Sequence, residues 1–155
     1  MLLKDLFNSE RIIMDLKARD KEALFKELAE ILSTKYGIDN RKEILNAILE
    51  RESKFSTGIK EGIAIPHGKT DAVNGVIGIL GISRSGIEYD SLDGKPVNIV
   101  FLIVSSQRES EEHLSILKRL AILLEETNFS REVLASKDSS EINKILERYE
   151  ERVKI

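Results

Sequence analysis

The chain has 155 residues, 41% of them hydrophobic and 33% charged, which suits one domain with a continuous core and a polar surface. Its net charge of −3 gives no support for nucleic-acid binding, and the absence of cysteine excludes disulfides, thiolate metal sites and a cysteine nucleophile. The N-terminal segment lacks the pattern of a secretion signal, and every apolar stretch is far shorter than the ~20 residues of a membrane span. We therefore expect one cytoplasmic domain over residues 1–155, with no insertion into a membrane.

The first third of the chain has the periodicity of a short strand followed by two helices. Residues 12–16 predict the strand, and Asp20 then caps a helix whose apolar residues recur on one face. Gly37 lies just past the end of that helix. The second helix begins at Asn40, where Glu43 three residues later completes a capping box, and it ends near residue 52.

The middle of the chain combines an irregular stretch with two strongly apolar segments. Residues 54–75 are rich in glycine and show no sustained period. Residues 75–83 and 97–104 are rich in valine and isoleucine and predict buried central strands. A lesser strand is expected at residues 87–89, and Asp93-Gly94 marks the turn that follows.

The last third of the chain is predicted to be helical. One helix is expected from Ser110, which the pattern predicts as its cap, to about Glu126, and a short helical piece at residues 131–135. The last helix starts around Asp138, with Glu141 three residues on. Because strands and helices are interleaved, we predict an α/β (α+β) sandwich, a single mixed sheet of about five strands flanked by helices.

Two histidines are the main candidates for chemistry. His67 lies in the irregular stretch between Pro66 and Gly68, and the missing side chain of Gly68 would let another molecule approach the ring. From the residues alone, His67 is either a functional residue or an ordinary loop histidine. His113 is in the first turn of the third helix, where the helix dipole opposes protonation of the ring. It is therefore either a core residue or a neutral hydrogen-bond donor to an anion.

Other catalytic patterns do not fit. Gly68-Lys69-Thr70 follows Gly62 by one residue too many for a nucleotide-binding P-loop. The two histidines lack the spacing of a metal site, so no metal and no cofactor are predicted. The hydrolase elbow Gly-x-Ser-x-Gly is absent, and the hydroxyls of Ser56 and Thr57 fit capping or anion-binding roles better than that of a nucleophile.

Several segments resemble the enzyme IIA family of the bacterial sugar phosphotransferase system, of the fructose/mannitol type. This family includes the nitrogen-regulatory enzyme IIA proteins. Residues 56–68, ending in Ile65-Pro66-His67-Gly68, are similar to its phosphorylation motif. The further matches are Arg51-Glu52, residues 90–97, and His113-Leu114 with Leu117 and Leu120-Ala121. The likeness extends from about residue 3 to residue 146, and it implies one enzyme IIA domain.

The resemblance implies roles for individual residues. His67 would accept the phosphoryl group, His113 would be its partner, and Arg51 would bind phosphoryl oxygens with a planar fork of donors. Without the family, Arg51 would be interpreted as a surface ion pair at a helix end. Backbone amides near Thr57 and Gly68 are candidates for an anion-binding nest.

The resemblance also implies partners. The phosphoryl donor would be the phosphocarrier protein HPr, and the recipient would be a cysteine of an enzyme IIB on a separate chain, during uptake of a fructose-like sugar. Because both partners would dock at the same histidine, an apolar rim is expected, with Phe55, Ile59 and Ile63 as candidates.

Two alternatives remain open at this point. The chain could be a nitrogen-regulatory enzyme IIA whose phosphorylation switches its binding to other proteins. It could also be an interaction module without turnover, which the presence of Arg51, His67 and His113 disfavours.

Overall fold

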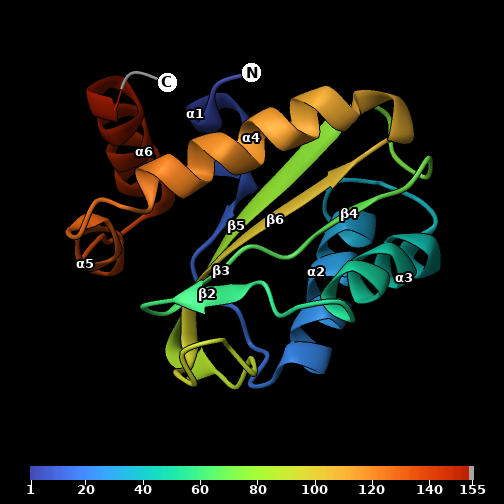
Figure 1. Ribbon diagram of the computed structural model, residues 1–155, viewed down its shortest axis with the longest axis horizontal. Coiled ribbons are helices and arrows are strands. Elements are labelled where there is room, and N and C mark those ends of the chain that lie inside the picture. The colour runs from blue at the N-terminus through green and yellow to red at the C-terminus, as the bar shows by residue number, and fades with distance from the viewer. Residues whose placement is uncertain (154–155) are drawn as a thin grey trace.

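The computed structural model describes residues 1–153, which are built around one six-stranded sheet (Figure 1). The strands are β1 (Ile12–Ile13), β2 (Gly58–Lys60), β3 (Ile63–Ala64), β4 (His67–Lys69), β5 (Val76–Ile87) and β6 (Val97–Ser105). The helices are α1 (Leu3–Leu6), α2 (Lys21–Thr34), α3 (Arg41–Glu52), α4 (Ser110–Leu123), α5 (Phe129–Leu134) and α6 (Ser139–Val153). Short 3-10 turns lie at Ser9–Arg11 and Gln107–Glu109. The predicted sandwich is confirmed, with six strands in place of about five.

The two long strands β5 and β6 pair antiparallel in the middle of the sheet. The strand order is β1-β5-β6-β3-β2, and β4 pairs with β6 beyond β3. Since β3 and β4 run parallel to β6 while β2 runs antiparallel to β3, the sheet is mixed. In this register His67 lies opposite Ile103 and Lys69 opposite Ser105, so β4 occupies the carboxyl end of β6.

The sheet separates two hydrophobic cores, and β6 contributes to both. Ile99, Phe101 and Ile103 face one core, which α1, α4, α5 and α6 cover. Val100 and Leu102 face the other, which α2 and α3 cover. This division follows from the two-residue period of a strand, whose successive side chains point to opposite faces. Within the described residues, no helix is both long and apolar enough to cross a bilayer.

The four predicted helix starts are confirmed, whereas the predicted caps are confirmed in two cases and wrong in two. The Asp20 carboxylate accepts from the backbone N–H of Ala23, and Asp138 accepts from that of Glu141, as N-caps do. Asn40 instead adopts a left-handed backbone (φ 63°) and its side chain makes no capping bond, so the capping box is absent. Ser110 is the first residue of α4, and its hydroxyl donates back to the Gln107 carbonyl rather than capping the helix.

The glycine-rich stretch at residues 54–75 is more regular than its sequence predicts. It holds β2, β3 and β4, each only two or three residues long. Such short strands show no periodicity. They form because β6 offers a partner to β3 and β4, and β3 in turn pairs with β2. Between β3 and β4, the Pro66 carbonyl accepts from the backbone N–H of Ile103 at 3.1 Å, which ties the approach to His67 to the sheet.

Candidate active site

His67 lies at the start of β4, half-buried, with one ring nitrogen already engaged. Its Nδ1 is 2.8 Å from the backbone carbonyl oxygen of Ile65. Because a carbonyl oxygen only accepts, Nδ1 carries the hydrogen and Nε2 keeps a free lone pair. Burial lowers the pKa of His67, the bond to Ile65 opposes this shift, and the charge of Arg51 adds to it. A neutral imidazole with a free Nε2 is the form able to act as a nucleophile.

His113 lies beside it, on the first turns of α4. The two ring centroids are 5.4 Å apart, with the planes inclined at 61°. The His113 ring is 2% exposed, and its Nδ1 is 2.5 Å from Oγ of Ser105. Burial, followed by the neighbouring His67 and Lys69, lowers the pKa of His113 to about 4. Burial is the leading cause of this shift, whereas the sequence pattern points to the helix dipole.

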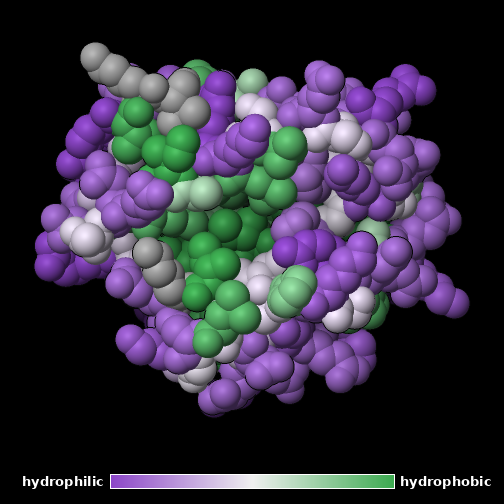
Figure 2. All heavy atoms as spheres, in the orientation of Figure 1, coloured by the Kyte–Doolittle hydropathy of each residue, from purple (hydrophilic) through white to green (hydrophobic). Residues whose placement is uncertain are grey.

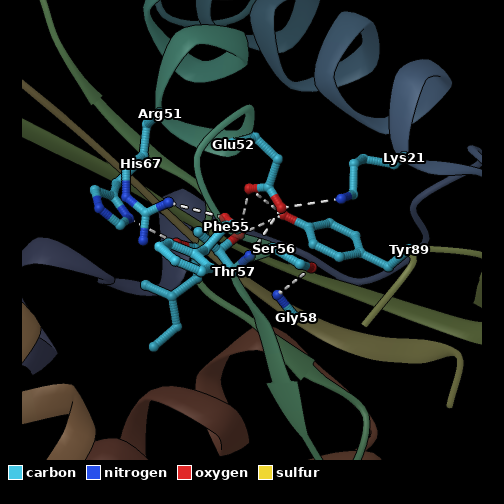
Figure 3. Close-up of polar contacts among 10 residues, drawn as sticks. Lys21, Arg51, Glu52, Phe55, Ser56, Thr57, Gly58, His67 and Tyr89 are labelled. Atoms are coloured by element: carbon cyan, nitrogen blue, oxygen red, sulfur yellow. Dashed lines mark hydrogen bonds and ion pairs between the residues drawn. The ribbon is translucent and has the colours of Figure 1, made fainter. Parts of the chain in front are cut away.

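Arg51 comes to the same place from the last turn of α3. Its guanidinium lies next to the His67 ring (Figure 3), and Nη1 donates to the carbonyl oxygen of Phe55 at 2.9 Å. The remaining guanidinium donors are available to a bound anion. The structure thus brings together the three side chains that the family resemblance singled out, from α3, β4 and α4.

These side chains line a cleft of about 600 Å³ between α3, β4 and the start of α4. Its lining residues are Ala47, Glu50, Arg51, Lys54, His67, Gly68, Lys69, Gln107, Ser110, Glu111, His113, Leu114 and Leu117. The cationic groups Arg51, Lys54 and Lys69 favour an anion in the cleft. Among the described residues, no three histidine or acidic side chains gather as metal ligands do.

Thr57 has a different place from the one expected of an anion-binding residue. Its backbone N–H donates to Glu52 at 2.8 Å, and its hydroxyl donates to the same carboxylate at 2.6 Å. Both donors are therefore used inside the protein, and Thr57 does not line the cleft. The neighbouring Ser56 hydroxyl accepts from the N–H of Gly58.

Gly68 lines the cleft, but the space beside it is taken by α3 rather than left for a ligand. A Cβ on this residue would lie 2.9 Å from the carbonyl carbon of Ala47 and 3.0 Å from its oxygen. The physical reason for glycine here is the close packing of β4 against α3.

The expected apolar rim is only partly present. Phe55 is 73% exposed and suits a rim, while Ile59 is half-buried and Ile63 is buried in the core. Leu114, at 53% exposure, lines the cleft and was not predicted as a rim residue. Figure 2 shows apolar side chains gathered in a hollow in the region that Figure 1 places between α4 and strands β2 and β3.

Sequence reasoning missed Ser105 and left Glu52 without a role. Ser105 is the last residue of a buried strand, and a polar residue there was the available signal. Glu52 was visible only as the neighbour of Arg51. Its contacts with Thr57 depend on how the chain turns after α3, which no local pattern encodes.

The chain matches known proteins over most of its length. The family model for "Phosphoenolpyruvate-dependent sugar phosphotransferase system, EIIA 2" matches residues 5–149. The chain is 33% identical over 97% of its length to the fructose-specific EIIABC component of Bacillus subtilis, and spans 24% of that longer protein. It is 32% identical to a nitrogen regulatory protein of Bradyrhizobium diazoefficiens, covering 94% of this chain and 95% of that one.

A solved structure shares the fold. The mannitol enzyme IIA of Escherichia coli, in its complex with phosphorylated enzyme IIB, superposes with a TM-score of 0.76 at 22% identity. The match covers 92% of this chain and 97% of that one. With the family model spanning nearly the whole chain, this protein belongs to the EIIA type 2 family of the phosphoenolpyruvate-dependent sugar phosphotransferase system.

Proposed function

We propose that this protein is a phosphoryl carrier that holds the group on Nε2 of His67. It would accept the group from phospho-HPr and pass it to a cysteine of an enzyme IIB on a separate chain, during uptake of a fructose-like sugar. The observation that carries the proposal is the bond from Nδ1 of His67 to the Ile65 carbonyl, which leaves Nε2 unprotonated in a cationic cleft.

The transfer step balances without an added base. The Nε2 lone pair attacks phosphorus while the P–N bond of the donor phosphohistidine breaks, and its electron pair returns to the donor ring. No proton has to leave His67 first, since Nε2 carries none. The positive charge that develops on the His67 ring is stabilised by the Ile65 carbonyl, which accepts from Nδ1.

The surrounding groups suit the charge on the transferred phosphoryl group. Phosphoryl transfer depends mainly on positioning and on electrostatic stabilisation. Arg51 would bind equatorial oxygens through its free guanidinium donors, assisted by Lys69. Oγ of Ser105 lies 2.5 Å from Nδ1 of His113. In the tautomer in which this hydroxyl donates to Nδ1, Nε2 of His113 carries a hydrogen that can be donated to a phosphoryl oxygen.

The comparisons support enzyme IIB as the recipient class. The Escherichia coli structure of similar fold is a complex of an enzyme IIA with a phosphorylated enzyme IIB. The Bacillus subtilis relative, by its name, joins A, B and C components in one protein. HPr enters the proposal through the family resemblance.

Labelling with radioactive phosphoenolpyruvate, enzyme I and HPr tests the proposal. We expect His67→Ala to abolish labelling. We expect His113→Ala to accept the phosphoryl group but to transfer it roughly 100-fold more slowly, because one transition-state donor is lost. Full labelling of the His67→Ala protein would refute the assignment.

The nitrogen-regulatory role is the second candidate, and the 32% identity to a nitrogen regulatory protein over nearly its full length favours it specifically. The phosphorylation chemistry at His67 would be the same, while the phosphorylated and free forms would differ in protein binding. Adding purified enzyme IIB domains to the phosphorylated protein separates the two roles. Rapid loss of the label to one of them supports transport, and retention of the label with every IIB supports regulation.

A further inference from the structure

Glu52, the last residue of α3, carries an unusually well-satisfied buried carboxylate (Figure 3). Its side chain is 6% exposed and lies 3.0 Å from Nζ of Lys21 on α2. The same carboxylate accepts from the backbone N–H and from the hydroxyl of Thr57. Because an unpaired buried carboxylate is strongly unfavourable, this set of partners fixes Glu52 in one position.

The hydroxyl of Tyr89 extends this network deeper into the protein. It lies 2.6 Å from Oγ1 of Thr57 and 3.3 Å from Glu52. Since Thr57 has one hydroxyl hydrogen and gives it to the carboxylate, Tyr89 donates to the Thr57 oxygen. Burial raises the pKa of Tyr89, so its hydroxyl keeps the proton that it donates.

The network closes the short loop at residues 53–56. Ser53, Lys54 and Phe55 are exposed, so side-chain packing in the core does not hold this loop. Thr57 is the first buried residue after α3, and it donates hydrogen bonds to the Glu52 carboxylate. The two ends of the loop are thus joined, because Glu52 before it is hydrogen-bonded to Thr57 after it.

The pinned loop bears directly on Arg51. The carbonyl oxygen of Phe55, inside the loop, accepts from Nη1 of Arg51 at 2.9 Å. Arg51 and Glu52 are sequence neighbours that point to opposite sides of the end of α3. Arg51 lines the cleft with His67, and Glu52 lines a separate hollow between α2 and α3.

We propose that Glu52 is a positioning residue that acts through Arg51. By holding Thr57, it sets the Phe55 carbonyl, and that carbonyl aims the Arg51 guanidinium at the phosphoryl group on His67. The inference rests on the proposed function for its effect on rate, while its effect on Arg51 is independent of that function. A freely rotating arginine would lose side-chain entropy each time it bound the phosphoryl group, and pre-setting it avoids this loss.

A double-mutant cycle tests whether Glu52 acts through Arg51. We expect Glu52→Gln to lower kcat/KM for phosphoryl acceptance from phospho-HPr by roughly tenfold, and less than twofold in an Arg51→Ala background. An undiminished rate in Glu52→Gln, or the same tenfold loss in both backgrounds, would overturn the proposal.

Glu150→Gln is the matched control. Glu150 is also a buried carboxylate that accepts backbone N–H groups, those of Leu3 and Lys4, and it pairs with Arg119 at 3.6 Å. It lies on α6, outside the cleft lining. We expect its variant to lower the thermal stability but to keep the acceptance rate. If Glu150→Gln lowered the acceptance rate as much as Glu52→Gln does, the rate loss of Glu52→Gln would be explained by general destabilisation.

A second pair of variants keeps the test valid if Glu52→Gln does not fold or if no phosphotransferase donor labels the protein. Thr57→Val and Tyr89→Phe remove hydroxyls without changing the net charge. Because the charge of Arg51 lowers the pKa of His67, we expect this pKa, measured by NMR titration, to rise in both variants as Arg51 loses its fixed position. An unchanged His67 pKa together with an unchanged Arg51 Nε–H signal would contradict the proposal, whatever the phosphoryl donor.

Discussion

At the scale of single residues, the environment of each histidine decides its chemistry. His67 is half-buried and bonded through Nδ1 to a carbonyl, so Nδ1 carries the hydrogen and Nε2 keeps its lone pair. His113 is enclosed, with Ser105 on one side and His67 on the other. Both rings have a lowered pKa, chiefly because burial disfavours the charged form.

The lowered pKa of His113 makes folding sensitive to acid. The pKa is about 4 in the folded protein, against about 6.5 in an unfolded chain. Between these values the unfolded state binds a proton that the folded state does not, so this contribution to stability is intact above pH ~6.5 and is lost as the pH falls toward 4. We expect the free energy of unfolding to drop by about 2 kcal/mol between pH 7 and pH 5 from this group.

Urea unfolding at the two pH values checks this expectation. The His113→Asn protein should lose about 2 kcal/mol less than the wild type over the same interval, because asparagine does not titrate. Identical losses in the two proteins would show that His113 is not the group responsible.

At the scale of elements, the packing of α3 on β4 builds the cleft. Ala47 contacts Gly68, and Arg51 lies one helical turn after Ala47 while His67 immediately precedes Gly68. The close approach of the two backbones at Gly68 therefore brings Arg51 to His67.

We expect Gly68→Ala to weaken both stability and phosphoryl acceptance. The added Cβ would meet the Ala47 backbone at 2.9 Å, which only a shift of α3 or β4 can relieve. Overpacking of this kind costs about 1–3 kcal/mol, and displacing Arg51 should lower the acceptance rate at least tenfold.

Gly78→Ala is the control for Gly68→Ala. Its Cβ would meet side chains of Phe7 and Leu6, on the face of the sheet opposite to α3. We expect a comparable loss in urea unfolding with an unchanged acceptance rate. Equal rate losses in the two variants would argue against a special role for the α3–β4 contact.

At the scale of the whole molecule, the sheet holds two cores apart and leaves the cleft at one end of β6. Helix α4 covers one core with Ile116 and Leu120, while Leu114 on the same helix is exposed at the cleft. An exposed apolar residue in the cleft that also holds His67 fits the proposed carrier, to which partner proteins would dock transiently.

We expect Leu114→Ser to raise KM for phospho-HPr roughly fivefold, about 1 kcal/mol of binding, with little change in kcat. Because the side chain is exposed, thermal stability should stay within about 0.5 kcal/mol. Ile122→Ser is the control, since Ile122 is 41% exposed on the same helix but does not line the cleft. A KM that is unchanged by Leu114→Ser, or raised equally by both variants, would contradict docking at Leu114.

Local pattern accounts for much of the framework. Helices α2 and α3 follow from apolar residues on one face, and the central strands β5 and β6 follow from their valine- and isoleucine-rich runs. The caps at Asp20 and Asp138 were likewise predictable, while Asn40 was not, because its left-handed backbone is imposed by the path of the chain between α2 and α3.

The sequence by itself determined the family, the two histidines and the order of long elements, because these depend on residues close together in the chain. The tertiary structure alone decided that His113 is enclosed beside His67, that Thr57 donates its hydrogen bonds to Glu52, and that α3 fills the space beside Gly68. The reason is that a hydrogen-bond donor pairs with the nearest acceptor in the folded protein. In the same way, the space beside a glycine is filled by whichever element packs against it. In both cases the partner lies on another element, whose distance along the chain carries no information about its distance in space.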